Sequence, residues 1–170
     1  PEEDVPYVLV ASDRLALART ACNFYGNPAR SMKLIGITGT NGKTSVTLLL
    51  KSVLEQTRGA KVGLVGTMGN MIGQEAIASD RTTPESLELQ QLFARMRDAG
   101  CRYAVMEVSS HAIALDRIGG IHYEAAAFTN LTEDHLDFHK TMEAYRDTKA
   151  ELFSRCDKAV INLDDPYGPY

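Results

Sequence analysis

The most informative segment of the sequence reads Gly36-Ile37-Thr38-Gly39-Thr40-Asn41-Gly42-Lys43-Thr44-Ser45. An apolar run from Lys33 to Ile37 leads into it and predicts a strand. After it, apolar residues recur at the spacing of one helix face, at Val46, Leu49, Leu50, Val53 and Leu54. A glycine-rich turn between a strand and a helix indicates a phosphate-binding loop, because its backbone N–H groups and the helix N-terminus converge on phosphate oxygens.

This loop predicts a nucleotide site. Lys43 supplies a positive charge to the terminal phosphates, and the Thr44 hydroxyl is placed to ligate the accompanying magnesium. The spacing departs from the usual pattern, since the fifth residue before Gly42 is Ile37, where a glycine is usual. We assign nucleotide binding to the run Gly39, Thr40, Asn41, Gly42, Lys43, Thr44 and Ser45.

The composition is that of an ordinary globular chain. Its 170 residues are 44% hydrophobic and 24% charged, which is enough for one core. The sequence has no run of about 20 apolar residues that would span a membrane, and its N-terminal Pro-Glu-Glu-Asp is acidic where a secretory signal is basic. We therefore expect a cytoplasmic protein with no membrane partner, and we expect a monomer.

Charge and cysteine content argue against other classes of function. The net charge of −4 gives no electrostatic reason to expect a nucleic-acid partner, and no basic run appears. Cys22, Cys101 and Cys156 are widely spaced and lack a Cys-x-x-Cys pair. Neither a disulfide framework nor a zinc site is indicated.

The residues before the loop are interpreted as the end of a preceding unit. The sequence predicts a short strand from Val5 to Val10 and a helix that is capped by Ser12 and runs to about Phe24. The segment Asn27-Pro28-Ala29-Arg30 then breaks the helix, which places the boundary at about residue 31.

The residues after the loop alternate between strands and helices. A helix start is predicted at Thr83-Pro84-Glu85, with Thr83 as cap, and this helix ends at Gly100; residues 66–73 are either a hairpin tip or a flexible loop. A later helix spans about residues 141–153. Strands are predicted at residues 61–66, 103–108, 123–129 and 158–162. This order predicts an α/β fold, a mostly parallel sheet with helices on both faces.

Polar clusters follow three of the predicted strands. One is the glycine-rich loop, the second is Glu107-Val108-Ser109-Ser110-His111, and the third runs from Thr129 to Asp137. Ligands of parallel sheets bind beyond the carboxyl ends of the strands. We therefore expect the three clusters to meet at one edge.

Near this edge, Glu107 and His135 each have two interpretations from the residues alone, and Lys149 has one. Glu107 ends an apolar strand, so it is either a magnesium ligand or a capping or salt-bridged carboxylate. His135 is either a metal ligand, which would act through water or favour manganese because magnesium prefers oxygen, or a loop histidine bonded to a carboxylate. Lys149 taken by itself is typical of a solvated surface lysine.

Four motifs in order resemble the Mur ligases, the cytoplasmic enzymes that extend the peptide of peptidoglycan precursors. They are the loop, the strand end Glu107 to His111, the segment with Thr129-Asn130-Leu131 and Asp134-His135-Leu136-Asp137, and Met142-Glu143-Ala144-Tyr145 before Lys149. The resemblance runs from about Tyr25 to Asp165. It implies the P-loop-type central domain of that family in incomplete form. Residues 1–31 would be the end of an N-terminal UDP-binding domain and linker, residues 32–170 the leading part of the ATP-binding domain, and the C-terminal domain would be absent.

The resemblance also implies the site. Catalytic roles would fall on Lys43, Glu107, His135 and Lys149, with ATP and Mg²⁺, or Mn²⁺, as cofactors. The implied metal ligands are Thr44, Glu107, His135 and a carbamylated Lys149. Carbamylation is chemically sensible because a neutral amine that captures carbon dioxide becomes a carboxylate, which requires burial to lower the lysine pKa.

Within the family, the pattern is most similar to ligases that act on UDP-N-acetylmuramoyl-L-alanyl-D-glutamate. Thr82, Thr83, Ser109 and Arg117 match positions that contact the UDP-muramoyl group. Two positions depart from the pattern. Arg81 stands where an asparagine often precedes the threonine pair, and Leu115 stands where some members carry a glutamine.

The implied reaction is ATP-dependent amide formation. The γ-phosphate would pass to the D-glutamyl carboxylate, and the amine of meso-diaminopimelate or L-lysine would then displace phosphate from the acyl phosphate. The adenine contacts and the determinants of amino-acid choice are expected beyond Tyr170, so we expect the chain alone to lack full turnover. A folylpolyglutamate synthetase-like ligase, whose loop is related, and a non-catalytic nucleotide-binding module are the alternatives.

Overall fold

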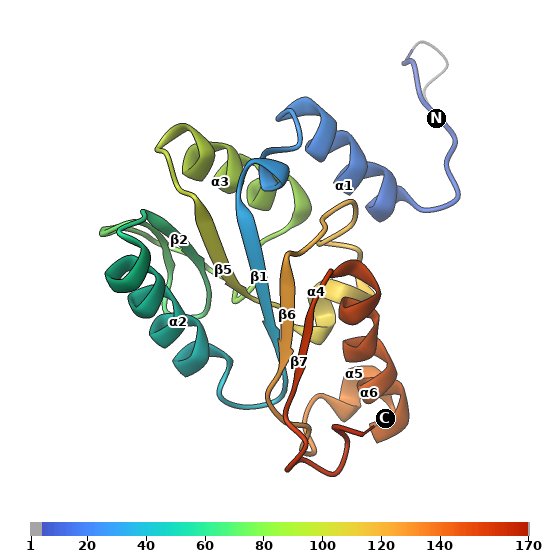
Figure 1. Cartoon of the computed structure of the whole chain (residues 1–170). Helices are drawn as coiled ribbons and strands as arrows, with labels where there is room; N and C mark the ends of the chain where they lie inside the picture. Colours follow the sequence, from blue (N-terminus) through green and yellow to red (C-terminus); the bar gives the residue numbers. More distant parts are fainter. Residues whose placement is uncertain (1–4, 170) are drawn as a thin grey trace.

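A seven-stranded sheet forms the centre of the computed structural model, which describes residues 5–169. The strand order is β4-β3-β2-β5-β1-β6-β7 (Figure 1). From β2 to β7 all neighbours pair in parallel, whereas β3 and β4 form an antiparallel hairpin at one edge. The mostly parallel α/β sheet is thus confirmed. The strands are β1 (Lys33–Thr38), β2 (Val62–Val65), β3 (Asn70–Ile72), β4 (Glu75–Ile77), β5 (Tyr103–Glu107), β6 (Ala125–Phe128) and β7 (Ala159–Ile161).

Helices cover both faces of the sheet, as the sequence predicts. The α-helices are α1 (Asp13–Phe24), α2 (Lys43–Arg58), α3 (Ser86–Asp98), α4 (Ser110–Ala114), α5 (Leu136–His139) and α6 (Met142–Ala150). Two 3₁₀ helices, η1 (Pro28–Ser31) and η2 (Glu151–Arg155), complete the described elements. The short helices α4 and α5 were not expected from the sequence, because each has too few turns to show a helical period.

Each face of the sheet has its own apolar cluster. On one face Val46, Leu50 and Leu54 of α2 pack against the cluster that contains Ile37 and Val105. On the other face α3 contributes Phe93 and Met96 to the larger core. The predicted apolar face of α2 is too wide, because Leu49 and Val53 are exposed. The buried face of this helix consists of Val46, Leu50 and Leu54 with the neighbouring Thr47 and Lys51.

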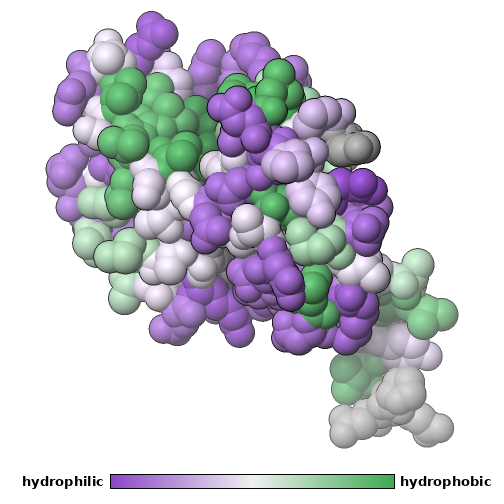
Figure 2. Space-filling model, turned by 90° about the horizontal axis from the view of Figure 1, so that it is seen from below, coloured by the Kyte–Doolittle hydropathy of each residue, from purple (hydrophilic) through white to green (hydrophobic). Residues whose placement is uncertain are grey.

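The predicted strand from Val5 to Val10 is wrong. This segment has no strand assignment and joins none of the strands described for residues 5–169. Its apolar side chains are exposed, with Leu9 at 92% of its full accessibility. Figure 2 shows them in green beside the grey atoms, projecting from the body. A short apolar segment alone cannot form a strand, because its backbone hydrogen bonds need a neighbouring strand.

The helix caps were predicted with mixed success. Ser12 caps α1 as expected, since its Oγ accepts a hydrogen bond from the N–H of Leu15 at 3.2 Å. Thr83 does not cap α3, whose N-cap is Glu85 in a capping box with Glu88. Thr83 is buried instead, and its hydroxyl donates to the Glu107 carbonyl at 2.9 Å. The Thr83 hydroxyl therefore bonds to Glu107, a distant residue, instead of to the first turn of α3.

Smaller boundaries also shift. Of the two alternatives for residues 66–73, the hairpin tip is present over residues 66–69, which join the antiparallel strands β2 and β3, whereas residues 70–72 form β3 itself and Gly73 lies in the turn to β4. The expected helix over residues 141–153 divides into α6 and η2.

The N-terminal helix α1 packs against α3, and Arg97 of α3 donates to the Tyr25 carbonyl at 2.9 Å. Among residues 5–169, no helix is both long and apolar enough to cross a membrane.

Candidate active site

The glycine-rich loop connects β1 to α2 at the carboxyl edge of the sheet, at the bottom of Figure 1. It is held by the segment that follows β6. The N–H of Thr40 donates to the Asn130 carbonyl at 2.8 Å, and the N–H of Asn41 donates to the Asn130 side chain at 2.9 Å. Thr129 donates back to the Asn41 carbonyl at 2.7 Å. The protein thus uses the N–H groups of Thr40 and Asn41, and the first turn of α2 offers further N–H groups to an anion.

Gly39 allows the two segments to meet. A Cβ at this position would lie 1.9 Å from the Thr129 Oγ1, and the Gly39 φ is +144°. Both the space and the backbone angle exclude a side chain. The contact between the loop and the segment after β6 therefore requires glycine.

Lys43 folds back over the loop. Its Nζ donates to the carbonyls of Gly39 at 2.9 Å and Thr40 at 2.8 Å. Burial lowers the pKa of Lys43, and the nearby carboxylates of Glu107 and Asp134 act in the opposite direction. The amine therefore lies at the mouth of the loop, where a phosphate would replace carbonyl oxygens as its acceptor.

Glu107 lies at the centre of the site and is only 1% exposed. Both of its carboxylate oxygens accept from the Thr44 hydroxyl at 3.0 Å. The N–H of Thr67 donates to Oε1 at 2.9 Å. A Cβ at Gly66 would lie 2.4 Å from the same oxygen, so Gly66 leaves the space that this carboxylate occupies. The structure brings Thr44 and Glu107 together, and Thr67 is a contact that the sequence analysis missed.

The oxygens of Thr44 and Glu107 fit a magnesium ion. Both are hard ligands, which Mg²⁺ prefers, and Mg²⁺ in nucleotide sites is held by one or two protein oxygens together with phosphates and water. Within the described part of the chain, no group of three or more His, Cys, Asp or Glu side chains is placed to hold a metal. A cation here would therefore depend on ligands that the nucleotide brings.

Lys149 is buried, with 3% exposure, so its interpretation as a solvated surface lysine is wrong. Its Nζ donates to the Gly39 carbonyl at 3.0 Å and lies 4.5 Å from the centre of the Tyr145 ring. Burial, followed by the positive charge of Lys43, lowers the pKa of Lys149 to about 7, although Asp134 opposes the shift. A sizeable fraction of this amine is neutral near pH 7.

This burial predicts a dependence of stability on pH. Above about pH 7 the folded state holds the Lys149 amine neutral, whereas the unfolded chain keeps it protonated up to its ordinary pKa. The unfolded state then binds more protons, so the free energy of unfolding should rise with pH above 7, by up to ~1.4 kcal/mol per pH unit. Urea unfolding between pH 7 and 10 would measure the slope. Lys149→Met should lose this contribution, and Lys33→Met, at an exposed lysine, should keep it; equal slopes in all three proteins would contradict the assignment.

His135 belongs to a cluster of aromatic rings that includes Tyr145, whose ring contacts Lys149. Its backbone is left-handed, with φ +51°, and its Nδ1 lies 3.4 Å from the Asp134 carboxylate. Its ring lies 4.9 Å from that of His111 and 6.1 Å from that of Tyr145. No contact described for residues 5–169 joins His135 to Glu107. The neighbouring carboxylate that the sequence allowed is therefore close to the ring, and its Oδ1 accepts from the His135 backbone N–H at 2.8 Å. A metal role of His135 stays a prediction.

The four residues predicted to contact the substrate lie together beside Glu107. The hydroxyls of Thr83 and Ser109 are 3.4 Å apart, and Arg117 donates to the Thr83 carbonyl at 3.2 Å. Arg117 also pairs with Glu85 at 2.9 Å, while its buried Nε has no hydrogen-bond partner among the described residues. Thr82 lies 2.9 Å from Thr67, hydroxyl to hydroxyl, which links this cluster to Glu107. The sheet edge therefore carries a phosphate loop and a second polar cluster, with one carboxylate between them.

Fold and site together define a phosphate-loop α/β domain with an adjoining polar substrate cluster. Residues 37–170 match the Mur ligase middle domain, so the chain belongs to that family.

Relatives cover nearly all of the chain. It is 53% identical over 167 residues, 98% of the chain, to the UDP-N-acetylmuramoyl-L-alanyl-D-glutamate--2,6-diaminopimelate ligase of Clostridium perfringens. It is 57% identical over 164 residues, 96% of the chain, to the enzyme of the same name from Caldanaerobacter subterraneus subsp. tengcongensis. In both cases the match covers 34% of the relative, so the chain spans about a third of the length of these proteins.

Two solved structures have a fold similar to that of this chain. A structure titled as a UDP-N-acetylmuramoyl-L-alanyl-D-glutamate--2,6-diaminopimelate ligase aligns with a TM-score of 0.80 and 31% identity, over 91% of this chain and 32% of that chain. The folylpolyglutamate synthase of Mycobacterium tuberculosis, complexed with ADP and AMPPCP, aligns with a TM-score of 0.74 over 91% of this chain and 43% of that one. At 19% identity the second likeness shows the fold alone.

Proposed function

We propose that the chain is part of an ATP-dependent ligase that adds the third amino acid to UDP-N-acetylmuramoyl-L-alanyl-D-glutamate during peptidoglycan precursor synthesis. One observation carries the proposal. Glu107 accepts from Thr44 of the phosphate loop through its side chain and from Thr83 of the second cluster through its carbonyl. Glu107 therefore lies between the proposed site of the phosphate donor, ATP, and the proposed site of the phosphate acceptor, the dipeptide carboxylate. The names of the relatives support this choice of substrate, and they favour 2,6-diaminopimelate over L-lysine as the amino acid.

In this proposal the loop residues 39–45 bind ATP, and Lys43 balances the charge of its terminal phosphates. Thr44 and Glu107 would hold a Mg²⁺ ion, or Mn²⁺ in its place, which neutralises phosphate charge when it is bound. Thr82, Thr83, Ser109 and Arg117 would hold the UDP-muramoyl dipeptide so that its free carboxylate faces the γ-phosphate. Positioning and charge then do most of the chemical work of forming an acyl phosphate.

Lys149 is proposed to be carbamylated and, with His135, to serve a second metal position. The support is the burial of its amine and the lowered pKa, because only a neutral amine reacts with carbon dioxide. A carbamate would also replace a positive charge beside Lys43 by a negative one, which Lys43 favours.

The chain is proposed to hold the end of the UDP-binding domain in residues 1–31 and the leading part of the ATP-binding domain in residues 32–170. Because the relatives are about three times as long, full turnover is expected only in a protein that includes their further domains. We also propose a cytoplasmic monomer. The alternatives are a folylpolyglutamate synthetase-like ligase, whose fold the chain shares, and a non-catalytic nucleotide-binding module.

Calorimetric titration of the chain with UDP-N-acetylmuramoyl-L-alanyl-D-glutamate and magnesium tests the substrate class. We expect saturable binding, and Arg117→Ala should weaken it roughly 10- to 100-fold, because a charged hydrogen bond to the ligand is worth about 1.5–3 kcal/mol. Arg102→Ala is the control, because Arg102 is exposed and lies in another part of the fold.

A folate and ATP should be titrated beside it. Binding of the folate in place of the muramoyl dipeptide would support the synthetase-like alternative. Muramoyl binding that Arg117→Ala leaves unchanged would contradict the substrate cluster. If the folded chain binds no ligand, the same titration on a protein that includes the further domains decides between a missing domain and a wrong substrate class.

A further inference from the structure

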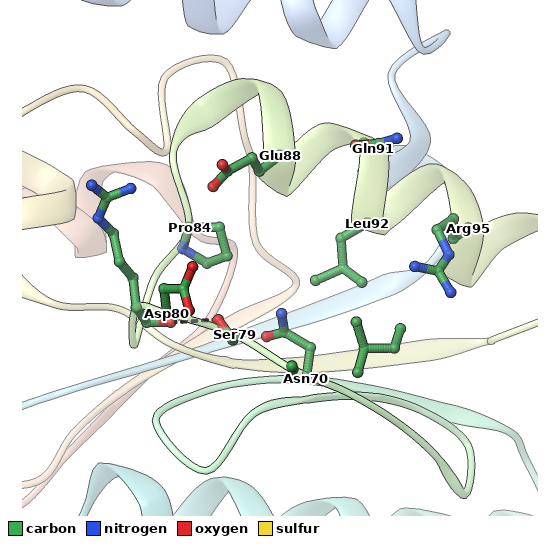
Figure 3. A pocket seen from close by; sticks show the side chains of 11 residues that line it. Asn70, Ser79, Asp80, Pro84, Glu88, Gln91, Leu92 and Arg95 are labelled. Carbon is green, nitrogen blue, oxygen red and sulfur yellow. Dashed lines mark hydrogen bonds between the residues drawn. The ribbon is translucent and has the colours of Figure 1, made fainter.

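A cavity of about 280 Å³ lies between the β3–β4 hairpin and α3, away from the phosphate loop. Figure 3 shows Asn70 on the hairpin side, with Pro84, Glu88, Leu92 and Arg95 on the α3 side. Its volume is close to the lower bound of about 300 Å³ for ligand pockets, so it suits one small molecule. The proposed function assigns no role to this cavity.

Asn70 lies at its floor with unused hydrogen-bonding capacity. The residue is 6% exposed, and its Oδ1 is buried with no hydrogen-bond partner among the described residues. Buried side-chain amides are ordinarily satisfied, so a buried acceptor that lines a cavity indicates a donor on whatever fills it. The same side chain presents an amide N–H₂ group. Asn70 therefore offers one acceptor and a donor group side by side.

The rim of the cavity carries charges of both signs. Arg81 and Arg95 are balanced by Asp80 and Glu88, all four of which line it. Each arginine makes one exposed ion pair, to Glu85 at 3.6 Å and to Glu75 at 3.4 Å, and such exposed pairs are weak and easily exchanged. Within residues 5–169 Asp80 forms no salt bridge. A simple anion would meet the two carboxylates, and a simple cation would meet the two guanidinium groups.

The rest of the wall contains the polar residues Ser79 and Gln91 and an apolar part. Ile77 of the hairpin and Leu92 of α3 face the cavity together with Pro84. A ligand that fits all three parts has a cationic donor and an anionic acceptor on neighbouring atoms, and an aliphatic group of a few carbons. These are the features of a free α-amino acid with an aliphatic side chain.

We propose that this cavity binds a free aliphatic α-amino acid, with its ammonium on Asn70 Oδ1 and Asp80, and its carboxylate on the Asn70 amide and an arginine of the rim. The side chain lies against Ile77 and Leu92. The inference goes beyond the proposed ligase function and does not rest on it, since it needs neither nucleotide nor muramoyl peptide.

NMR titration of the isotope-labelled full chain with L-leucine tests the proposal, without nucleotide or metal. We expect saturable shifts that include the Asn70 side-chain amide. Two analogues each lack one charge: 4-methylpentanoate has no ammonium, and 3-methylbutylamine has no carboxylate. Both should bind at least 10-fold more weakly than leucine, because each leaves rim charges of one sign and part of Asn70 unpaired.

Two variants separate binding from folding. Asn70→Leu replaces the amide by an apolar group of similar size and should abolish the saturable shifts. Ala78→Trp fills the cavity from its exposed rim and should do the same without altering a buried residue. Arg102→Gln, outside the cavity, should bind leucine as the parent chain does. No saturable shift up to the solubility limit of leucine, equal binding of either analogue, or leucine binding that survives in a folded Ala78→Trp chain would overturn the proposal.

Discussion

Glu107→Gln is expected to lower the turnover number about 10²- to 10³-fold in a protein that carries this chain with the further domains of its relatives, a loss typical for one preorganised electrostatic group. The substitution keeps the shape of the side chain, so the contacts with Thr44 and Thr67 can persist. It removes the negative charge that would balance a cation beside the phosphates. The loss should therefore appear in the dependence of the rate on Mg²⁺ as well as in the maximal rate.

Two controls distinguish this role from a purely structural one. Glu55→Gln makes the same change at a residue of α2 that pairs with Lys51, far from the carboxyl edge, and should leave turnover within about threefold. The Thr67 hydroxyl donates to Glu107 Oε2 at 3.1 Å. Thr67→Ala removes this donor but keeps the Glu107 carboxylate, and should cost less than Glu107→Gln. A Glu107→Gln enzyme with normal turnover and normal Mg²⁺ dependence would rule out the metal assignment.

Gly39→Ala is expected to destabilise the fold by about 2–5 kcal/mol. The new Cβ would lie 1.9 Å from the Thr129 Oγ1, and the φ of +144° is unfavourable for any residue with a side chain. Overpacking costs about 1–3 kcal/mol and backbone strain of this kind a similar amount. Urea unfolding of the chain measures the change.

Comparison with a second glycine separates the two causes. Gly42 has a φ of +83°, and a Cβ added there would meet no atom within 4 Å, so Gly42→Ala should show the cost of strain alone, about 1–3 kcal/mol. Adding Thr129→Ala to Gly39→Ala should recover part of the loss, as a positive coupling in a double-mutant cycle. Equal stabilities of the Gly39 and Gly42 variants would contradict the close approach.

The fold was largely predictable because its signals are local. The strand, loop and helix around Gly39 follow from glycine chemistry and apolar spacing, and the order of strands and helices predicts the parallel sheet. The strand at Val5 to Val10 failed because the same apolar pattern needs a partner strand, and a sequence window contains no information about one. Thr83 failed as a cap for a related reason, since its hydroxyl bonds to Glu107, 24 residues away.

The location of the site could be predicted from the sequence, but several of its contacts could not. The rule that ligands gather at the carboxyl edge places Glu107 beside the loop, and the same rule applied to Gly66-Thr67, directly after β2, would have found the Thr67 contact. The burial of Lys149 was not accessible from its residue type, because lysine is usually exposed. Resemblance to a family singled it out, and the packing of α6 against the loop explains its lowered pKa.

The carbonyl oxygen of Gly39 accepts from both Lys43 and Lys149, at 2.9 and 3.0 Å. Besides burial, the positive charge of Lys43 lowers the pKa of Lys149, so the protonation states of the two amines are coupled. Where Lys149 is not carbamylated, an anionic phosphate that enters the loop would favour its protonated form, so the arrival of the phosphate should draw a proton from the solvent near neutral pH. By thermodynamic reciprocity, a rise in pH should then weaken the binding of that phosphate. Proton uptake and phosphate binding are thus coupled at the Gly39 carbonyl oxygen, which both amines contact.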